Sequence, residues 1–179
     1  FSALPAAKEM LALCERIPLI DGLSTKGLKP KESTVKGRVE FKNISFAYPA
    51  RPDTNVCEGF NLSVEPGETV AIYGASGSGK STTANLLLRF YDPQEGEVTI
   101  DGVNIKTLNS RWLRNQIGYV GQEPYLFSGT IADNISDGID IEISGPVNTG
   151  DQHIRERIEA AAMLANCHDF IMSFPKGYA

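Results

Sequence analysis

The chain has 179 residues, of which 41% are hydrophobic and 22% are charged, which is typical of about one globular domain with a buried core. Its net charge of −5 argues against a general nucleic-acid-binding protein. No stretch approaches the roughly 18 apolar residues of a membrane-spanning helix, and prolines and charges interrupt residues 1–20 too often for a signal peptide. Because the sequence begins with Phe1, we expect the natural start to lie upstream.

Charged residues are unevenly distributed along the chain, and its three cysteines lie far apart. Residues 26–42 contain six basic and two acidic side chains, whereas residues 132–160 contain seven acidic and two basic ones. Glycine and proline within the basic run favour a solvated linker; a patch for phosphate or a membrane surface is the alternative. Cys14, Cys57 and Cys167 lie far apart without a Cys-x-x-Cys pair, which predicts reduced thiols in a cytosolic compartment.

The first half of the chain predicts a helix, a linker and strands. Apolar residues recur at helical spacing over residues 6–17, which indicates a packing helix that ends at Pro18. Residues 21–37 form the linker. A strand begins at Arg38 with a phase slip at Asn43 that indicates a bulge, and residues 60–64 form a second strand before the turn at 65–68. Residues 69–73 are continuously apolar, as expected for a strand buried in a parallel sheet.

Further elements follow a glycine-rich loop. A helix is predicted from this loop to about Phe90, then a short strand at 98–100 with an Asp101-Gly102 hairpin turn. A helical stretch at 111–115 precedes a strand at 117–120. Residues 136–150 are expected to form an exposed loop, and Asp151 to cap a helix with apolar positions 154, 158, 161, 162 and 165.

The glycine-rich loop matches the pattern G-x-x-x-x-G-K-[ST], the P-loop or Walker A motif. It reads Gly74-Ala75-Ser76-Gly77-Ser78-Gly79-Lys80-Ser81-Thr82. Glycines let the backbone adopt positive φ and approach phosphates closely, so that successive N–H groups form an anion-binding nest at a helix start. Lys80 can then reach the β- and γ-phosphates, and the Ser81 hydroxyl can ligate Mg²⁺. A chance glycine turn is the alternative, but the predicted strand before the loop and helix after it favour a phosphate site.

Several motifs occur in the order seen in one family. They read Phe46-Ala47-Tyr48-Pro49-Ala50-Arg51-Pro52, the P-loop, Phe90-Tyr91-Asp92-Pro93, and Gly121-Gln122-Glu123-Pro124-Tyr125-Leu126-Phe127. Residues 130–135 and 170–175 continue the likeness, which runs from about Ile17 to the last residue. The chain resembles the ATP-binding domains of ABC transporters of the exporter type, in particular the multidrug-resistance, P-glycoprotein-like branch.

The resemblance implies a fold and two domains. The expected fold class is α/β: a P-loop NTPase core with a mainly parallel, incomplete sheet, and an antiparallel β-subdomain from about residue 38 to 68. Residues 1–37 would be the helix and linker that follow a transmembrane domain. Residues 38–179 would be the N-terminal part of the ATP-binding domain.

The resemblance also assigns roles to residues outside the loop. Tyr48 matches the aromatic residue that stacks on adenine, with an ordinary strand-end tyrosine as the alternative. Gln122 matches the glutamine that ligates Mg²⁺ or orients the attacking water, with a surface glutamine as the alternative. Lys80 and Gln122 are therefore the expected catalytic residues, ATP and Mg²⁺ the expected cofactors, and Ser81 and Gln122 the expected metal ligands. Neither His153 nor His168 follows a predicted strand, so both are expected on helices without a catalytic role.

Other family motifs do not occur. The sequence contains no apolar run ending in Asp-Glu after the P-loop and no LSGGQ. In the family these lie beyond the segment that matches residues 174–178, so we expect a fragment that binds ATP but lacks the hydrolytic glutamate. The implied partners are the transmembrane domains of the same protein and a second ATP-binding domain, at the cytoplasmic face of a membrane. Amphipathic or drug-like compounds are the implied transported substrates.

Two other functions remain open from the sequence. One is a different P-loop enzyme such as a GTPase or nucleotide kinase, although the guanine-selective [NT]KxD sequence does not occur. The other is a module that holds nucleotide without hydrolysing it. An extension containing LSGGQ and Asp-Glu would distinguish them from an ABC ATPase.

Overall fold

A computed structural model describes residues 3–123, 125–139 and 149–179. The chain divides into two compact units, residues 1–118 and 119–179, which are described separately below. None of the helices among the described residues is both long and apolar enough to cross a membrane.

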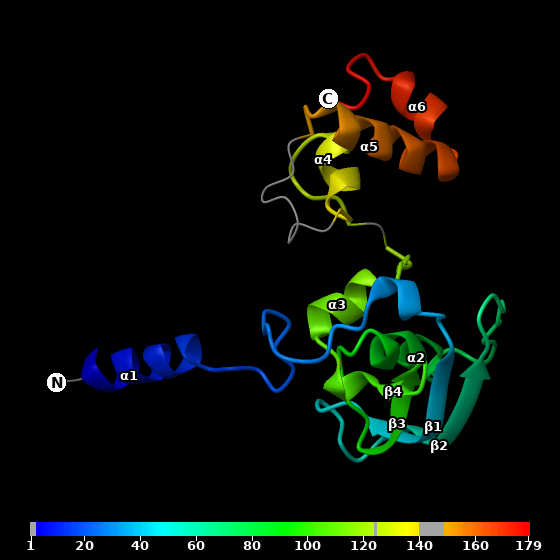
Figure 1. The fold of residues 1–179 in the computed structure, drawn as a ribbon. Helices are drawn as coiled ribbons and strands as arrows, with labels where there is room; N and C mark the ends of the chain where they lie inside the picture. Colours follow the sequence, from blue (N-terminus) through cyan, green and yellow to red (C-terminus); the bar gives the residue numbers. More distant parts are fainter. Residues whose placement is uncertain (1–2, 124, 140–148) are drawn as a thin grey trace. The chain divides into compact units, whose positions relative to one another are not determined.

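The first unit is built on a four-stranded antiparallel sheet of order β2-β1-β3-β4 (Figure 1). The strands are β1 (Val39–Ala47), β2 (Asn55–Val64), β3 (Glu95–Ile100) and β4 (Val103–Asn104). Val39 pairs with Val64 on one side and with Ile100 on the other, so β1 is an interior strand, as is β3. The predicted antiparallel β-subdomain is confirmed, and β3 and β4 extend it beyond residue 68.

Helices and short 3-10 turns complete the first unit. They are α1 (Ala3–Cys14), η1 (Glu32–Thr34), α2 (Lys80–Leu87), η2 (Ile105–Thr107) and α3 (Ser110–Asn115). Leu86 of α2 joins a core cluster with strand residues and the segment after β4. Its buried members are Phe41, Ile44, Phe46, Leu86, Val98, Ile100, Ile105, Leu108 and Leu113.

Two local backbone features follow the sequence prediction. Asn43 has a φ of 51°, and the register of β1 shifts between Phe41 and Ile44, which confirms the bulge. Asp101 and Gly102 have φ values of 50° and 80°, as a tight hairpin turn between β3 and β4 requires. Asp101 also accepts hydrogen bonds from the N–H groups of Lys36, Gly37 and Arg38.

Two predicted core strands are not strands. Residues 69–73 and 117–120 have no ladder partner in the structure, and Ile72, Tyr73 and Val120 are 44%, 94% and 96% exposed. Their sequence favours a strand, but an extended segment becomes one only when a neighbouring strand satisfies its N–H and C=O groups. The described residues have no parallel ladder, and their one parallel bridge joins Leu28 to Leu108.

Helix ends and the linker also differ from the prediction. The first helix ends at Cys14, and the described apolar side chains on it are exposed rather than packed. The helix after the P-loop ends at Leu87 rather than near Phe90, because Arg89 adopts a left-handed φ of 50°. The linker is held at Leu28, whose N–H donates to Thr107 O while its carbonyl accepts from Asn109 N, both at 2.9 Å. It is therefore exposed but partly fixed to the first unit.

The second unit contains α4 (Ile131–Ser136), α5 (Gln152–Leu164) and α6 (His168–Met172) (Figure 1). Asp151 caps α5 by accepting from the N–H groups of His153 and Ile154, as predicted. Ile158 and Ala162 of the predicted apolar stripe are buried, whereas Ala161 and Ala165 are exposed. Most of the predicted loop at 136–150 lies outside the described residues; Ser136 is the last residue of α4 and is buried.

Candidate nucleotide-binding site

The P-loop leads directly into α2, as its motif requires. Gly79 is the N-cap of α2 and has a φ of 87°, and Gly77 has a φ of 81°. A Cβ at Gly79 would lie 3.1 Å from Val56 Cγ1 and 3.2 Å from Val56 O, so the loop approaches β2 closely. Glycine is required at this position both for the backbone conformation and for this contact.

The Lys80 ammonium lies within the loop that precedes it. Its Nζ donates to Gly74 O at 2.8 Å and to Ala75 O at 2.6 Å, and Ser78 Oγ lies 3.5 Å away. These acceptors are neutral, and no acidic side chain of the described residues forms an ion pair with the ammonium. The arrangement presents a cation among glycine-rich backbone at a helix start, which suits the phosphates of a nucleotide.

The next two residues of α2 have different environments. Ser81 is exposed, so its hydroxyl is accessible as an oxygen ligand for a metal ion such as Mg²⁺. Thr82 is only 3% exposed, and its Oγ1 lies 3.0 Å from the Tyr48 hydroxyl. The structure therefore brings Tyr48, from the end of β1, together with the P-loop helix.

Tyr48 has three further partners that the sequence did not reveal. Asn85 Nδ2 donates to the Tyr48 hydroxyl at 3.2 Å. The ring of Tyr91 meets the ring of Tyr48 edge-on, with centroids 5.1 Å apart and planes at 89°. Phe46 makes a similar contact at 4.9 Å. The one sequence signal for these contacts was that Tyr91 belongs to the Phe90–Pro93 motif.

Gln122 belongs to the second unit and is exposed. It follows residues 117–120, which are not a strand, and Pro124 lies outside the described residues. The structure groups Tyr48 with Lys80, Ser81 and Thr82 in the first unit. His168, also in the second unit, lies at the start of α6 with Nδ1 2.8 Å from the Tyr178 hydroxyl, and His153 is exposed on α5.

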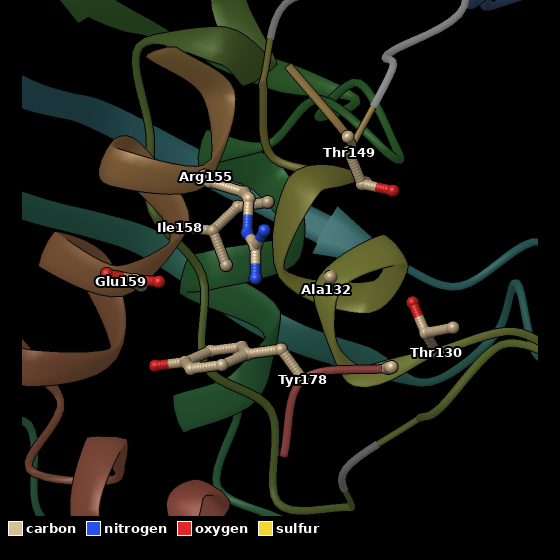
Figure 2. Close-up of a pocket in the computed structure, with 9 residues that line it drawn as sticks. Thr130, Ala132, Thr149, Arg155, Ile158, Glu159 and Tyr178 are labelled. Atoms are coloured by element: carbon tan, nitrogen blue, oxygen red, sulfur yellow. The ribbon is translucent and has the colours of Figure 1, made fainter. Parts of the chain in front are cut away.

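One cavity lies beside the P-loop lysine, and another lies in the second unit. One of about 310 Å³ is lined by Lys80 and Thr83 together with apolar side chains of β1, β2 and residues 70–72. Another, of about 290 Å³, lies in the second unit, where Arg155 and Glu159 of α5 and Tyr178 line it (Figure 2). This second cavity contains none of the predicted site residues.

A thiol lies beside the P-loop. A Cβ at Gly79 would be 3.5 Å from Cys57 Sγ, and burial raises the pKa of Cys57 above its ordinary value. The thiol is thus neutral at physiological pH and packs against the loop without adding negative charge where phosphates would bind.

Comparison with known proteins agrees with this geometry. Residues 57–175 match the model of the ABC transporter family. The chain is 49% identical over 98% of its length to Multidrug resistance protein 1 of Entamoeba histolytica, and 49% identical over 97% to the Sophorolipid transporter of Starmerella bombicola. It spans 13% of the length of each of these relatives.

A solved structure gives the same result. The chain superposes on a bacterial Atm1-family ABC exporter with ATP bound, with a TM-score of 0.79 and 35% identity over 98% of this chain and 28% of that one. The α/β fold with its antiparallel sheet is thus that of an exporter nucleotide-binding domain, which excludes the other P-loop enzymes considered above. The chain belongs to the ABC transporter family, among exporters related to the multidrug transporters.

Proposed function

We propose that residues 74–82 bind the phosphates of Mg-ATP, and that in the intact protein this site belongs to a transport-coupled ATPase. The observation that carries the proposal is the position of Lys80 Nζ, 2.8 Å and 2.6 Å from two carbonyls of its own glycine loop. Charged phosphate oxygens form stronger hydrogen bonds with an ammonium than neutral carbonyls do. When nucleotide binds, Lys80 would therefore exchange its hydrogen bonds to the loop carbonyls for hydrogen bonds to phosphate oxygens.

Ser81 and Gln122 are the proposed Mg²⁺ ligands, and Gln122 also orients the attacking water. Support for Ser81 comes from its exposed hydroxyl beside Lys80. Hydroxyl and amide oxygens suit this hard cation, which keeps several waters and phosphate oxygens in its shell. Gln122 is included in the proposed site because it matches the glutamine of the family motif.

Tyr48 is the proposed adenine-binding residue. Support comes from its contact with Thr82, which places an aromatic side chain beside the first turn of the P-loop helix. Base–aromatic stacking contributes about 1–3 kcal/mol per base, which is enough to matter for a site otherwise built on phosphate contacts.

In the intact protein, ATP binding and hydrolysis would drive the transport of amphipathic or drug-like compounds across a membrane. Residues 1–37 would connect a transmembrane domain to the ATP-binding domain, whose parallel core sheet would include residues 69–73. A second ATP-binding domain would pair with it across two nucleotides at the cytoplasmic face. Relatives named as multidrug resistance proteins and as a sophorolipid transporter support this class of substrate.

The test of this function is Lys80→Ala in the intact protein. We expect ATPase activity to fall by about tenfold or more, because the lysine supplies the main side-chain charge toward the γ-phosphate. The fold, followed by circular dichroism, should not change. ATP turnover close to that of the unsubstituted protein would overturn the assignment.

Residues 1–179 alone are proposed to bind Mg-ATP weakly without hydrolysing it. In-line attack needs a group that accepts the proton of water, and the sequence contains neither the Asp-Glu nor the LSGGQ motif of the family. Phosphate release by these residues, measured beside the Lys80→Ala variant to reveal contaminating enzymes, should be at background. Turnover that Lys80→Ala abolishes would point to another base such as Glu123.

A further inference from the structure

A polar cavity of about 210 Å³ lies between the linker and the segments that follow α2 and β4. A water molecule occupies about 30 Å³ in the liquid, so the cavity is large enough for a small ion with its hydration. Its lining combines linker residues with side chains from positions 89–110. The lining residues are Leu19, Ile20, Asp21, Ser24, Lys26, Gly27, Arg89, Lys106, Leu108 and Ser110.

Three cations and one carboxylate line this cavity. Among the described residues, Lys106 Nζ makes one long hydrogen bond, to Pro93 O at 3.4 Å. Arg89 uses Nε toward Asp92 and Nη1 toward Leu108 O, which leaves Nη2 for another acceptor. Lys26 is exposed, and its ammonium makes no hydrogen bond or ion pair with the described residues. The carboxylate, Asp21, accepts from the N–H of Leu23.

The positive side chains of the cavity do not serve to bind the free carbonyls at the C-terminal end of α2. Carbonyls at a helix C-terminus attract positive side chains, and here Arg114 fills that role by donating to Leu88 O and Arg89 O at 3.1 Å. Burial, and to a lesser extent the nearby charge of Arg89, lowers the pKa of Arg114. Lys26 and Lys106 make no contact with the carbonyls of α2.

The linker wall of the cavity is fixed by Asn109. The Asn109 side chain is 1% exposed, and its Nδ2 donates to Ser24 O and Lys26 O, both at 2.8 Å. Gly27 lies so close to the Asn109 backbone that a Cβ there would be 2.6 Å from Asn109 N. These contacts fix the backbone of Lys26 in the wall of the cavity that Arg89 and Lys106 also line, which lowers the cost of ordering the linker when an anion binds.

We propose that this cavity is a second anion site, which binds the phosphate group of a free phosphate or of an anionic lipid head group. It goes beyond the nucleotide site proposed above and is separate from it. Lys80 begins α2 and Arg89 follows its end, and the eight residues of this helix span about 12 Å. Phosphate matches the cavity because its several oxygens can accept hydrogen bonds from Nη2 of Arg89 and from the two ammonium groups.

The test is binding of inorganic phosphate to the intact protein, measured by titration calorimetry in a Lys80→Ala background so that the P-loop contributes least. Lys26→Gln with Lys106→Gln removes two cavity cations. Lys8→Gln with Lys31→Gln is the matched control, since it removes the same charge from exposed lysines outside the cavity. We expect affinity to fall by about tenfold or more in the first pair and to stay unchanged in the second.

Two soluble lipids distinguish the sources of the phosphate. If dihexanoyl phosphatidate binds more tightly than inorganic phosphate, and its affinity falls in the Lys26→Gln, Lys106→Gln variant, the ligand is a lipid head group. If the two affinities are equal, the ligand is free phosphate. The proposal is overturned if phosphate does not bind, if both variant pairs respond alike, or if dihexanoyl phosphatidylcholine binds as well as phosphatidate. None of these outcomes depends on ATPase activity, so the proposed nucleotide site is tested separately.

Discussion

In the proposed nucleotide site, Tyr48 would contribute through its hydroxyl as well as its ring. The hydroxyl joins the end of β1 to Thr82 and Asn85 of α2, while the ring packs against Phe46 and Tyr91. Base stacking would depend on the ring, which Phe46 and Tyr91 also hold in place, whereas the hydroxyl adds hydrogen bonds that stabilise the fold. Substitutions can separate these two contributions.

For Tyr48→Phe we expect ATP affinity close to that of the unsubstituted protein but a free energy of unfolding lower by about 1 kcal/mol, since a buried hydrogen bond is lost. Tyr48→Ala should weaken ATP binding by about 1–3 kcal/mol. Nucleotide titration and urea unfolding measure the two effects. Combining Tyr48→Phe with Thr82→Val should add little further loss of stability, because both remove the same bond. Equal losses of ATP affinity in the Phe and Ala variants would mean that the hydroxyl, not the ring, recognises the base.

Asp101 makes the end of the linker sensitive to acid. Burial raises its pKa, but hydrogen bonds from the N–H groups of Arg38, Gly37 and Lys36 outweigh this and hold the pKa below its ordinary value of 3.8. A carboxyl with a lowered pKa stabilises the fold above its ordinary pKa, and this contribution disappears as the pH falls through the lowered value.

We therefore expect residues 36–38 to lose amide protection below about pH 4, as the Asp101 carboxylate becomes protonated. Hydrogen exchange corrected for intrinsic rates measures this. Asp101→Asn tolerates the left-handed backbone but does not titrate, so its protection should be lower at neutral pH and independent of acid. An acid response that persists in Asp101→Asn would assign the effect to another group.

At the scale of elements, Asn109 performs two tasks with one side chain. Its Oδ1 accepts from Trp112 N and caps α3, while its Nδ2 holds the linker carbonyls of Ser24 and Lys26. The amide is the one short side chain that both accepts and donates in this way. A carboxylate of the same shape would keep only the first task.

Asn109→Asp should preserve α3 and release the linker, whereas Asn109→Ala should disrupt both and cost about 1–2 kcal/mol from the cap alone. Limited proteolysis of residues 24–28, with urea unfolding for stability, measures the two effects. Faster cleavage in both variants, with the smaller loss of stability in Asn109→Asp, is the expected pattern. A linker as protected in Asn109→Asp as in the unsubstituted chain would show that the backbone bridge at Leu28 suffices.

The sequence predicted those elements whose conformation is set by neighbouring residues. The bulge at Asn43, the Asp101-Gly102 turn and the Asp151 cap depend on local backbone chemistry, and the structure confirms them. The end of α2 was placed too late, because the left-handed Arg89 is held by Asp92 and Leu108 O and not by its own propensity. Three partners of Tyr48, namely Thr82, Asn85 and Tyr91, lie 34 to 43 residues away, and no local pattern reveals such contacts.

At the scale of the whole molecule, residues 69–73 and 117–120 illustrate the limit of such predictions. Both have the apolar, β-branched or aromatic composition of buried strands, yet neither has a partner among the described residues. A strand is a property of a pair, so its formation depends on chain segments that its own sequence does not contain. The parallel core of the site thus remains a prediction for the intact protein.

We expect the amides of residues 69–73 to be strongly protected from hydrogen exchange in the intact protein and to exchange rapidly in residues 1–179 alone, where this segment has no ladder. The amides of β1 serve as the internal control, since they are paired on both sides in the structure. Rapid exchange at 69–73 in the intact protein would exclude a core strand before the P-loop. Unpaired apolar segments also make residues 1–179 prone to aggregation, which light scattering would detect.

The hydrogen bonds of Asn109 also determine how the first unit responds to mechanical tension. They anchor the chain at residues 24–28, before β1 begins at Val39. We therefore expect a pull on α1 to load Asn109 and the start of α3 before it reaches β1. Arg114 of α3 donates to Leu88 O and Arg89 O, so the same tension would be passed on to the end of the P-loop helix.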